Sequence, residues 1–253
     1  MTGGARLFAR YAFAPNELGY CGPADAAALF DLAATGITGT GITGIAKRFH
    51  GAWPYLAVLA ELAGLDDPLD QRVVRAYWTG GPLLRQADRA AFGARLLAVI
   101  GPQAGHYWAH LTDDLLPEVT ATHAFHVLGV YPWSRLLAAG RPEHPLRVLD
   151  MCRIRWGRVI TRDQDHVVVS SRHLTWDGSR LGLSAPTQER VRIAVDGVSF
   201  VPDAGPGDWL ALHWDWACER LSPVHLADLR HWTRWQLMAT NSRLAGAGLK
   251  AGP

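Results

Sequence analysis

Leu149–Val159, with the sequence Leu-Asp-Met-Cys-Arg-Ile-Arg-Trp-Gly-Arg-Val, marks the point at which the pattern of the chain changes. Before this stretch, apolar residues recur at steps of three and four, which is typical of amphipathic helices. After it, as far as about Ser222, short runs alternate between apolar and polar residues, which is typical of half-buried strands. Cys152 therefore lies at the start of the first strand pattern, and we expect the chemistry of the protein near this thiol.

The residues before this stretch predict a helical bundle. Helices are expected at 24–34, 45–63, 71–78, 83–87 and 89–100, the second of them interrupted or kinked near Pro54. The segment 7–21 contains Pro15 together with Gly19, and such residues oppose a long helix. We therefore expect this segment to be an ordered loop that lies over the core.

The residues after the stretch predict a small β-structure. Strands are expected at 158–162, 166–171, 173–176, 181–183, 189–195, 198–201 and 209–214. So many short strands favour a small barrel, because closure of the sheet removes exposed edges. A helix from Ser222 to about Thr240 follows, with Pro223 as its first helical residue.

A turn-rich segment at 138–145 is the predicted domain boundary. It divides the chain into a helical domain at 1–145 and a barrel with a C-terminal helix at 146–253. The predicted fold class is therefore α+β, with an N-terminal all-helical domain followed by a small β-barrel and a C-terminal helix. A chain of 253 residues is long enough to bury a core in such an arrangement.

Composition and charge exclude several classes of protein. Hydrophobic residues make up 49% of the chain and charged residues 19%, which is typical of a folded protein rather than a disordered one. The formal net charge is +2 and its basic residues are interspersed with acidic ones, so no basic stripe favours nucleic acid. The chain shows no apolar run long enough to predict a membrane span and no signal peptide, so we expect a cytoplasmic protein.

The cysteines and histidines include candidate metal ligands. Three widely spaced cysteines, Cys21, Cys152 and Cys218, without a CxxC pair, favour reduced thiols over a disulfide framework or a zinc ribbon. His123 and His126 are three residues apart and would share one face of a helix, which suits metal ligands as well as buried hydrogen bonds. Cys21 lies in a constrained loop, where it either packs in the core or faces the same cleft as Cys152.

Two segments of the C-terminal region resemble a known family. Met151-Cys-Arg-Ile-Arg-Trp-Gly-Arg-Val159 is followed about fifty residues later by Gly207-Asp-Trp-Leu-Ala-Leu-His-Trp-Asp-Trp-Ala-Cys-Glu-Arg-Leu221. A Met-Cys start, a Gly-x-Val strand, a Gly-Asp-aromatic turn and a strand histidine ahead of a C-terminal helix occur here in an order that is similar to the HypC/HupF family of [NiFe]-hydrogenase assembly chaperones. The resemblance covers roughly residues 150 to 240.

This resemblance implies an OB-like barrel that handles iron. It implies that Cys152, with His213, binds the iron that carries cyanide and carbon monoxide and passes it between a scaffold partner and the hydrogenase large-subunit precursor. A thiolate is a soft ligand that suits such iron, and an imidazole can supply a second ligand. Cys21, His123 and His126 are possible additional ligands. Four tryptophans are candidates for a surface that docks protein partners, namely Trp156, Trp209, Trp214 and Trp216.

Three functions remain open on the sequence. The first is an accessory protein for [NiFe]-hydrogenase maturation, a chaperone or iron carrier rather than an enzyme, with hydrogenase maturation proteins as partners. The second is a metal- or thiol-dependent enzyme, in which histidines of the helical domain, including His106 and His110, serve a metal or a cysteine thiol. The third is an OB-type nucleic-acid-binding module with the tryptophans as a stacking platform, which the absence of a basic groove disfavours.

Overall fold

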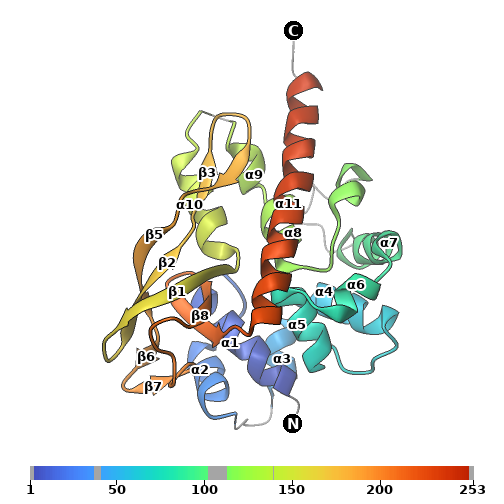
Figure 1. Ribbon diagram of the computed structural model, residues 1–253. Coiled ribbons are helices and arrows are strands. Elements are labelled where there is room, and N and C mark those ends of the chain that lie inside the picture. Colours follow the sequence, from blue (N-terminus) through green and yellow to red (C-terminus); the bar gives the residue numbers. More distant parts are fainter. Residues whose placement is uncertain (1–2, 37–40, 102–112, 139, 251–253) are drawn as a thin grey trace.

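The chain folds into a helical region, a ring of five strands and a long C-terminal helix, as Figure 1 shows for the computed structural model. The structure describes residues 3–36, 41–101, 113–138 and 140–250. The predicted fold class, a helical part followed by a small closed β-structure and a C-terminal helix, is confirmed. Within these ranges, no helix combines the length and the apolar character that a membrane span requires.

Short helices make up the first part of the chain. Their bounds are α1 (Gly3–Glu17), α2 (Ala26–Thr35), α3 (Ile42–Lys47), α4 (Trp53–Leu62), α5 (Gln71–Thr79), α6 (Pro82–Gln86), α7 (Arg89–Ile100), the 3-10 helix η2 (Asp113–Glu118), α8 (His123–Phe125), the π-helical turn η3 (His126–Val130), α9 (Trp133–Leu136) and α10 (Glu143–Cys152). The carboxylates of Asp70 and Asp88 accept hydrogen bonds from the first turns of α5 and α7. The predicted helix at 45–63 is two helices, and Pro54 lies in the first turn of α4, where a missing N–H group costs nothing.

Helix α1 shows that the prediction of a loop at 7–21 is wrong over most of its length. The helix contains Pro15, and most of its residues are buried. A proline in a helix removes one N–H donor, which here is the group that would bond to the carbonyl oxygen of Tyr11 four residues earlier. That oxygen instead accepts a hydrogen bond from Nδ1 of His213, at 2.7 Å. Burial of the helix and this replacement bond offset the cost of the proline.

Five strands form the ring, in the order β1–β2–β5–β9–β8. They are β1 (Arg155–Arg162), β2 (His166–Ser171), β5 (Thr187–Arg192), β8 (Trp209–His213) and β9 (Trp216–Arg220). All neighbours are antiparallel except β5 and β9, which close the ring through one parallel pair, Arg192 with Trp216. The valines Val167, Val169 and Val191 alternate with more exposed residues and fill the small core of the ring.

Two short hairpins extend from the ring, one formed by β3 (Leu174–Trp176) and β4 (Leu181–Leu183) and one by β6 (Ala194–Val195) and β7 (Val198–Ser199). The alternation at 173–183 predicts the first hairpin. The hairpin expected at 189–201 is divided, because its first half belongs to β5. The sequence pattern does not predict β9, because four of its five residues are buried and apolar and polar residues do not alternate along it.

Cys152 lies at the end of helix α10, and its predicted position at the start of a strand is wrong. The helix ends there because Arg153 has an extended backbone, and β1 begins at Arg155. Helical residues therefore reach further into the quoted stretch than its pattern indicates. The cysteine lies on the connection between the last helix before the ring and the first strand of the ring.

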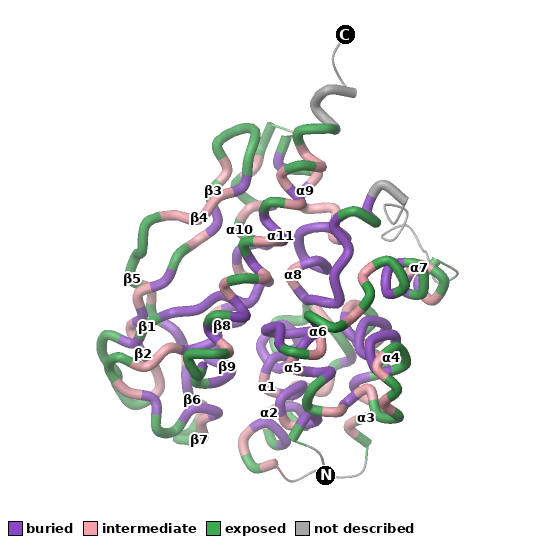
Figure 2. The backbone as a smooth tube through the Cα atoms, turned by 45° about the vertical axis from the view of Figure 1, so that its right-hand side comes forward, coloured by how far each residue is buried: buried purple, intermediate pink, exposed green. Residues whose placement is uncertain are grey.

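Helix α11 (Pro223–Lys250) lies between the ring and helices α5 to α7, as Figure 1 shows. It begins at the predicted proline and continues well beyond Thr240. One cluster of buried apolar side chains extends from Ala5 to Leu237 and so includes residues on both sides of the predicted boundary. Figure 2 shows the buried backbone at the centre of the molecule. The boundary at 138–145 stays a prediction.

Candidate metal centre

Three side chains meet where the helical region contacts the ring. His123 begins α8, Cys152 ends α10 and His213 ends β8. Their ligand atoms, one nitrogen from each histidine and the sulfur of the cysteine, all lie within 4.8 Å of one another. The three residues are 6%, 8% and 1% exposed, respectively, so bulk water has little access to these atoms.

The turn after β8 brings Cys152 and His213 together. Strands β1 and β8 pair in antiparallel register, and a hydrogen bond from the backbone N–H of Trp214 to the carbonyl oxygen of Met151, at 2.8 Å, extends the pairing beyond the strands. Trp214 has a φ of 56°, which is a strained conformation for a bulky residue. The guanidinium of Arg155 donates to the carbonyl oxygen of Trp214 and holds this turn in place.

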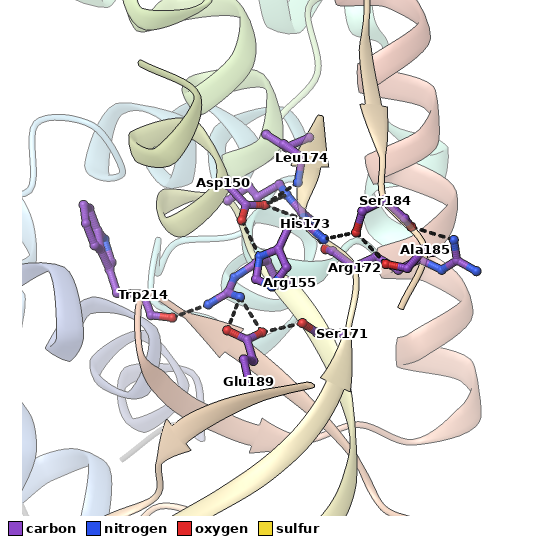
Figure 3. Close-up of polar contacts among 11 residues, drawn as sticks. Asp150, Arg155, Ser171, Arg172, His173, Leu174, Ser184, Ala185, Glu189 and Trp214 are labelled. Atoms are coloured by element: carbon purple, nitrogen blue, oxygen red, sulfur yellow. Dashed lines mark hydrogen bonds and ion pairs between the residues drawn. The ribbon is translucent and has the colours of Figure 1, made fainter. Parts of the chain in front are cut away.

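Buried charged side chains anchor the end of α10, and Figure 3 shows polar contacts of this network. The carboxylate of Asp150 accepts hydrogen bonds from Arg153, at 2.8 Å, and from the ring of His173, at 2.7 Å. Burial raises the pKa of Asp150, but Arg153, Arg155 and the hydrogen bonds more than offset this effect, so its pKa lies below the usual value. Arg155 also pairs with Glu189 in β5, at 2.7 Å. The network therefore fixes the cysteine end of α10 relative to the ring.

His213 is oriented as a metal ligand. Its Nδ1 contacts the carbonyl oxygen of Tyr11, which can only accept, so Nδ1 carries the proton and Nε2 carries the lone pair. Nε2 is buried and has no hydrogen-bond partner among the described residues. An imidazole that donates from one nitrogen to a backbone carbonyl is the usual arrangement behind a metal-bound histidine. The missing N–H of Pro15 thus explains why the lone pair of His213 faces the cluster.

His123 has two possible proton positions. With the proton on Nε2, the ring donates to the carbonyl oxygen of Cys152, at 2.9 Å, and accepts from the hydroxyl of Tyr77. With the proton on Nδ1, the ring donates to Tyr77, at 3.0 Å, and Tyr77 donates to the carbonyl oxygen of Gly51, at 2.9 Å. Only the second arrangement turns the lone pair of Nε2 toward the cluster. Tyr77 makes this arrangement available, because its hydroxyl can accept and donate at once.

The electrostatic environment keeps both imidazoles neutral. Burial lowers the pKa of His213 to about 4, and burial followed by the nearby His213 and His126 lowers the pKa of His123 well below its usual value. Burial also raises the pKa of the Cys152 thiol. Neutral imidazoles are ready to bind a metal ion, whereas a buried thiol becomes a thiolate when an ion takes the place of its proton.

The cluster borders a cavity of about 20 Å³, which is room for about one water molecule. An open pocket of about 400 Å³ lies beside this cavity. The residues that line both spaces are Tyr20, Cys21, Gly51, His126 and Tyr131. The open pocket therefore adjoins the cavity that the cluster borders.

The donor set selects a class of metal ions. Two imidazoles and a thiolate suit zinc, iron, nickel or copper, whereas magnesium and calcium prefer oxygen ligands. None of the described residues that line the cavity carries a carboxylate. Three protein ligands are one fewer than a tetrahedral ion accepts. The cluster can therefore hold one transition-metal ion and leave a position for a further ligand.

The structure brings together only some of the predicted site residues. The predicted pair Cys152 and His213 is joined by His123, which was a possible additional ligand. Cys21 and His126 line the same cavity but do not belong to the cluster. His106 and His110 lie outside the described residues.

The four tryptophans predicted to dock a partner are largely covered. Trp156, Trp214 and Trp216 are buried, and Trp209 is half-buried. Trp214 stacks on Tyr20 with ring centroids 4.1 Å apart. Docking through these side chains stays a prediction, and among the four only Trp209 offers appreciable surface.

Sequence reasoning does not identify Tyr77 or the carbonyl group of Tyr11 as parts of the site. Tyr77 lies among apolar residues in α5, where a tyrosine is an ordinary core residue. The signal for Tyr11 is Pro15, because a proline inside a helix frees the carbonyl group four residues earlier. That signal requires knowledge that 3–17 is helical, which Pro15 and the nearby Gly19 conceal.

Comparison with known proteins gives a family but no function. No curated protein and no solved structure matches the chain. A family described as a family of unknown function, DUF6390, matches residues 1–247, and the match gives no assignment to the HypC/HupF family. Because this match covers nearly the whole sequence, the chain belongs to the DUF6390 family.

Proposed function

We propose that the protein binds one transition-metal ion through His123, Cys152 and His213. The observation that carries this proposal is the buried Nε2 of His213, which has no hydrogen-bond partner among the described residues and lies in a cluster with a thiol and a second imidazole. A buried polar atom without a partner costs about 1–3 kcal/mol. A metal ion bound to this lone pair offsets that cost.

The ion is proposed to be iron that the protein carries during [NiFe]-hydrogenase maturation. This role rests on the resemblance of 150–240 to the HypC/HupF family, in which the corresponding cysteine and histidine handle iron with cyanide and carbon monoxide. Two observations support it: Cys152 and His213 are close in space, and three protein ligands leave open positions on an iron ion, which accepts more ligands than a tetrahedral ion does. The partners are then hydrogenase maturation proteins or the large-subunit precursor.

Metal analysis tests the binding proposal. The purified protein is loaded with Fe²⁺ or Zn²⁺, passed over a desalting column and analysed for bound metal. We expect one ion per chain, lost in His123→Ala, Cys152→Ala and His213→Ala but kept in Cys218→Ala, which removes a buried thiol that does not line the cavity. Circular dichroism of each variant verifies the fold. Wild-type protein that folds but retains no ion contradicts the proposal.

Infrared spectroscopy tests the role in hydrogenase maturation. The protein is purified together with hydrogenase maturation proteins, and bands of bound cyanide and carbon monoxide are expected in the wild type. Cys152→Ala should lack these bands. Their absence from the wild type, or their persistence in Cys152→Ala, contradicts the iron-carrier role while leaving metal binding itself to the first experiment.

A second candidate function is a metal-dependent enzyme that keeps its ion. The observation in its favour is burial, because a ligand cluster at most 8% exposed is hard for a partner protein to reach, whereas the adjoining pocket admits a small molecule. The two functions differ in the fate of the ion. Protein loaded with radioactive iron is mixed with the hydrogenase large-subunit precursor; transfer of the label supports the carrier, and complete retention supports the enzyme.

A further inference from the structure

The charge of the proposed site is unbalanced with three ligands. A divalent ion bound by two neutral imidazoles and one thiolate keeps one net positive charge. No described residue that lines the cavity supplies a carboxylate to neutralise it. An uncompensated charge in a buried site is costly, so the fourth ligand of a divalent ion is expected to be an anion.

Cys21 is the lining residue that can supply this negative charge. It lies on the segment between α1 and α2, and it borders both the small cavity and the open pocket. The unpartnered Nε2 of His213 faces the same cavity and is an independent sign of a ligand site there. A hydrogen bond from Asn16 to the carbonyl oxygen of Cys21, at 2.7 Å, fixes the backbone of this loop beside the cavity.

We propose that Cys21 is the fourth ligand and that it completes a neutral two-cysteine, two-histidine centre for a divalent ion such as Zn²⁺ or Fe²⁺. This inference rests on the proposed metal site and adds its fourth ligand. As each sulfur–metal bond forms, the thiol releases its proton to solvent, so two thiolates balance the two charges of the ion. Four such ligands also complete the tetrahedral geometry that zinc prefers.

His126 is the competing lining residue, and charge distinguishes it from Cys21. An imidazole is neutral as a ligand, so His126 would leave the net positive charge in place. In addition, Nδ1 of His126 contacts the hydroxyl of Tyr55, at 3.3 Å. Nε2 of His126 lies against Gly51, because a Cβ atom added to this glycine would be 2.5 Å from that nitrogen. The imidazole of His126 is thus closely packed in its present position. Cys21 lies outside the cluster of three, and it lines the small cavity that the three ligands border.

Titration with Co²⁺, followed by absorption spectroscopy, tests the ligand set, because each thiolate bound to cobalt adds to the charge-transfer absorption. Cys21→Ala should bind one Co²⁺ with about half of the wild-type charge-transfer intensity, as expected for one thiolate instead of two. Its Kd for Zn²⁺, measured by competition with a chelator, should rise about 100-fold or more, because loss of a ligand should exceed the effect of losing an outer partner. Cys218→Ala is the matched control and should behave as the wild type.

Proton release gives a second measurement. Binding of Zn²⁺ in weakly buffered solution should release two protons per ion from the wild type and one from Cys21→Ala. Equal spectra, affinities and proton counts in the wild type and Cys21→Ala overturn the inference, and a loss of affinity in His126→Ala rather than in Cys21→Ala does so as well. Failure of the metal site itself is distinguishable, because the wild type would then bind no ion at all.

Discussion

Proton positions on two histidine rings decide whether the cluster can hold a metal ion. His213 has its tautomer fixed by the carbonyl group of Tyr11, which lacks its helical donor because residue 15 is a proline. His123 is fixed less firmly, because its Nε2 also lies 2.9 Å from the carbonyl oxygen of Cys152. The proposed metal binding at His123 therefore depends on the group that accepts a hydrogen bond from its Nδ1, which is the hydroxyl of Tyr77.

Replacement of the Tyr77 hydroxyl should weaken metal binding without unfolding the protein. Tyr77→Phe keeps the ring, which is fully buried, and removes the acceptor for Nδ1 of His123. The proton then stays on Nε2, where it bonds to the carbonyl oxygen of Cys152. We expect the Kd for Zn²⁺ to rise about 10–100-fold, as for other outer partners of metal-bound histidines.

Competition with a chelator measures this Kd, and thermal unfolding of the metal-free variant measures its stability. Tyr55→Phe is the matched control, since its hydroxyl contacts His126 and not the cluster. A Tyr77→Phe protein with wild-type affinity would show that the hydroxyl does not set the tautomer of His123.

Replacement of His213 should abolish metal binding at little cost in stability. His213→Leu removes a nitrogen that has no partner among the described residues, which stabilises, and leaves the carbonyl oxygen of Tyr11 without its donor, which destabilises. Each effect is about 1–3 kcal/mol, so they largely offset each other. We expect the free energy of unfolding of the metal-free protein to change by no more than about 2 kcal/mol. Urea unfolding measures it, and a loss several times larger would assign His213 a structural role.

At the scale of elements, the end of α10 depends on one buried carboxylate. Asp150 pairs with Arg153, and these two side chains are 9% and 2% exposed. Asp150→Asn keeps the shape but leaves the buried charge of Arg153 without its partner. Breaking such a pair costs about 3–5 kcal/mol, so we expect a loss of stability near the lower value because the amide keeps one acceptor.

Urea unfolding of the metal-free protein tests this prediction. Asp177→Asn is the control, because that carboxylate lies in an exposed turn and accepts hydrogen bonds that an amide oxygen can also accept. The change in Asp150→Asn should far exceed the change in Asp177→Asn. Comparable values for the two variants would show that the network in Figure 3 is not what holds the end of α10.

The sequence predicts the positions of helices and strands better than it predicts the contacts between them. Alternation of apolar and polar residues locates β1, β2 and the hairpin of β3 and β4, and the Met-Cys and strand-histidine order selects Cys152 and His213 as candidates, which lie close together. Helix α1 is missed because a proline is read as a break, although packing and one hydrogen bond from His213 sustain the helix. His123 is ambiguous in the sequence because its role depends on contacts with residues far away along the chain.

At the scale of the whole molecule, the cluster joins parts of the chain that are distant in sequence. His123 belongs to the helical region, and Cys152 and His213 belong to the ring and its entry. Other contacts across the same division are buried, such as the pairing of Arg75 and Tyr11 with Glu219 in β9. A single core also spans both parts. Unfolding is therefore expected to be one cooperative transition, to which a bound ion is coupled.

Metal binding should accordingly raise the melting temperature of the whole chain. An ion present at about 1,000 times its Kd stabilises the folded state by about 4 kcal/mol. For a chain of this size, that corresponds to a rise in Tm of roughly 10 °C. Circular dichroism follows the helices, whereas tryptophan fluorescence reports on the packing around the indoles, both of the ring (Trp156, Trp209 and Trp216) and of helices such as α5, which contains Trp78. Both signals should shift together on addition of Zn²⁺, and neither should shift in Cys152→Ala. Two transitions, of which only one responds to the ion, would show that the helical region and the ring unfold separately and that the ion is not held between them.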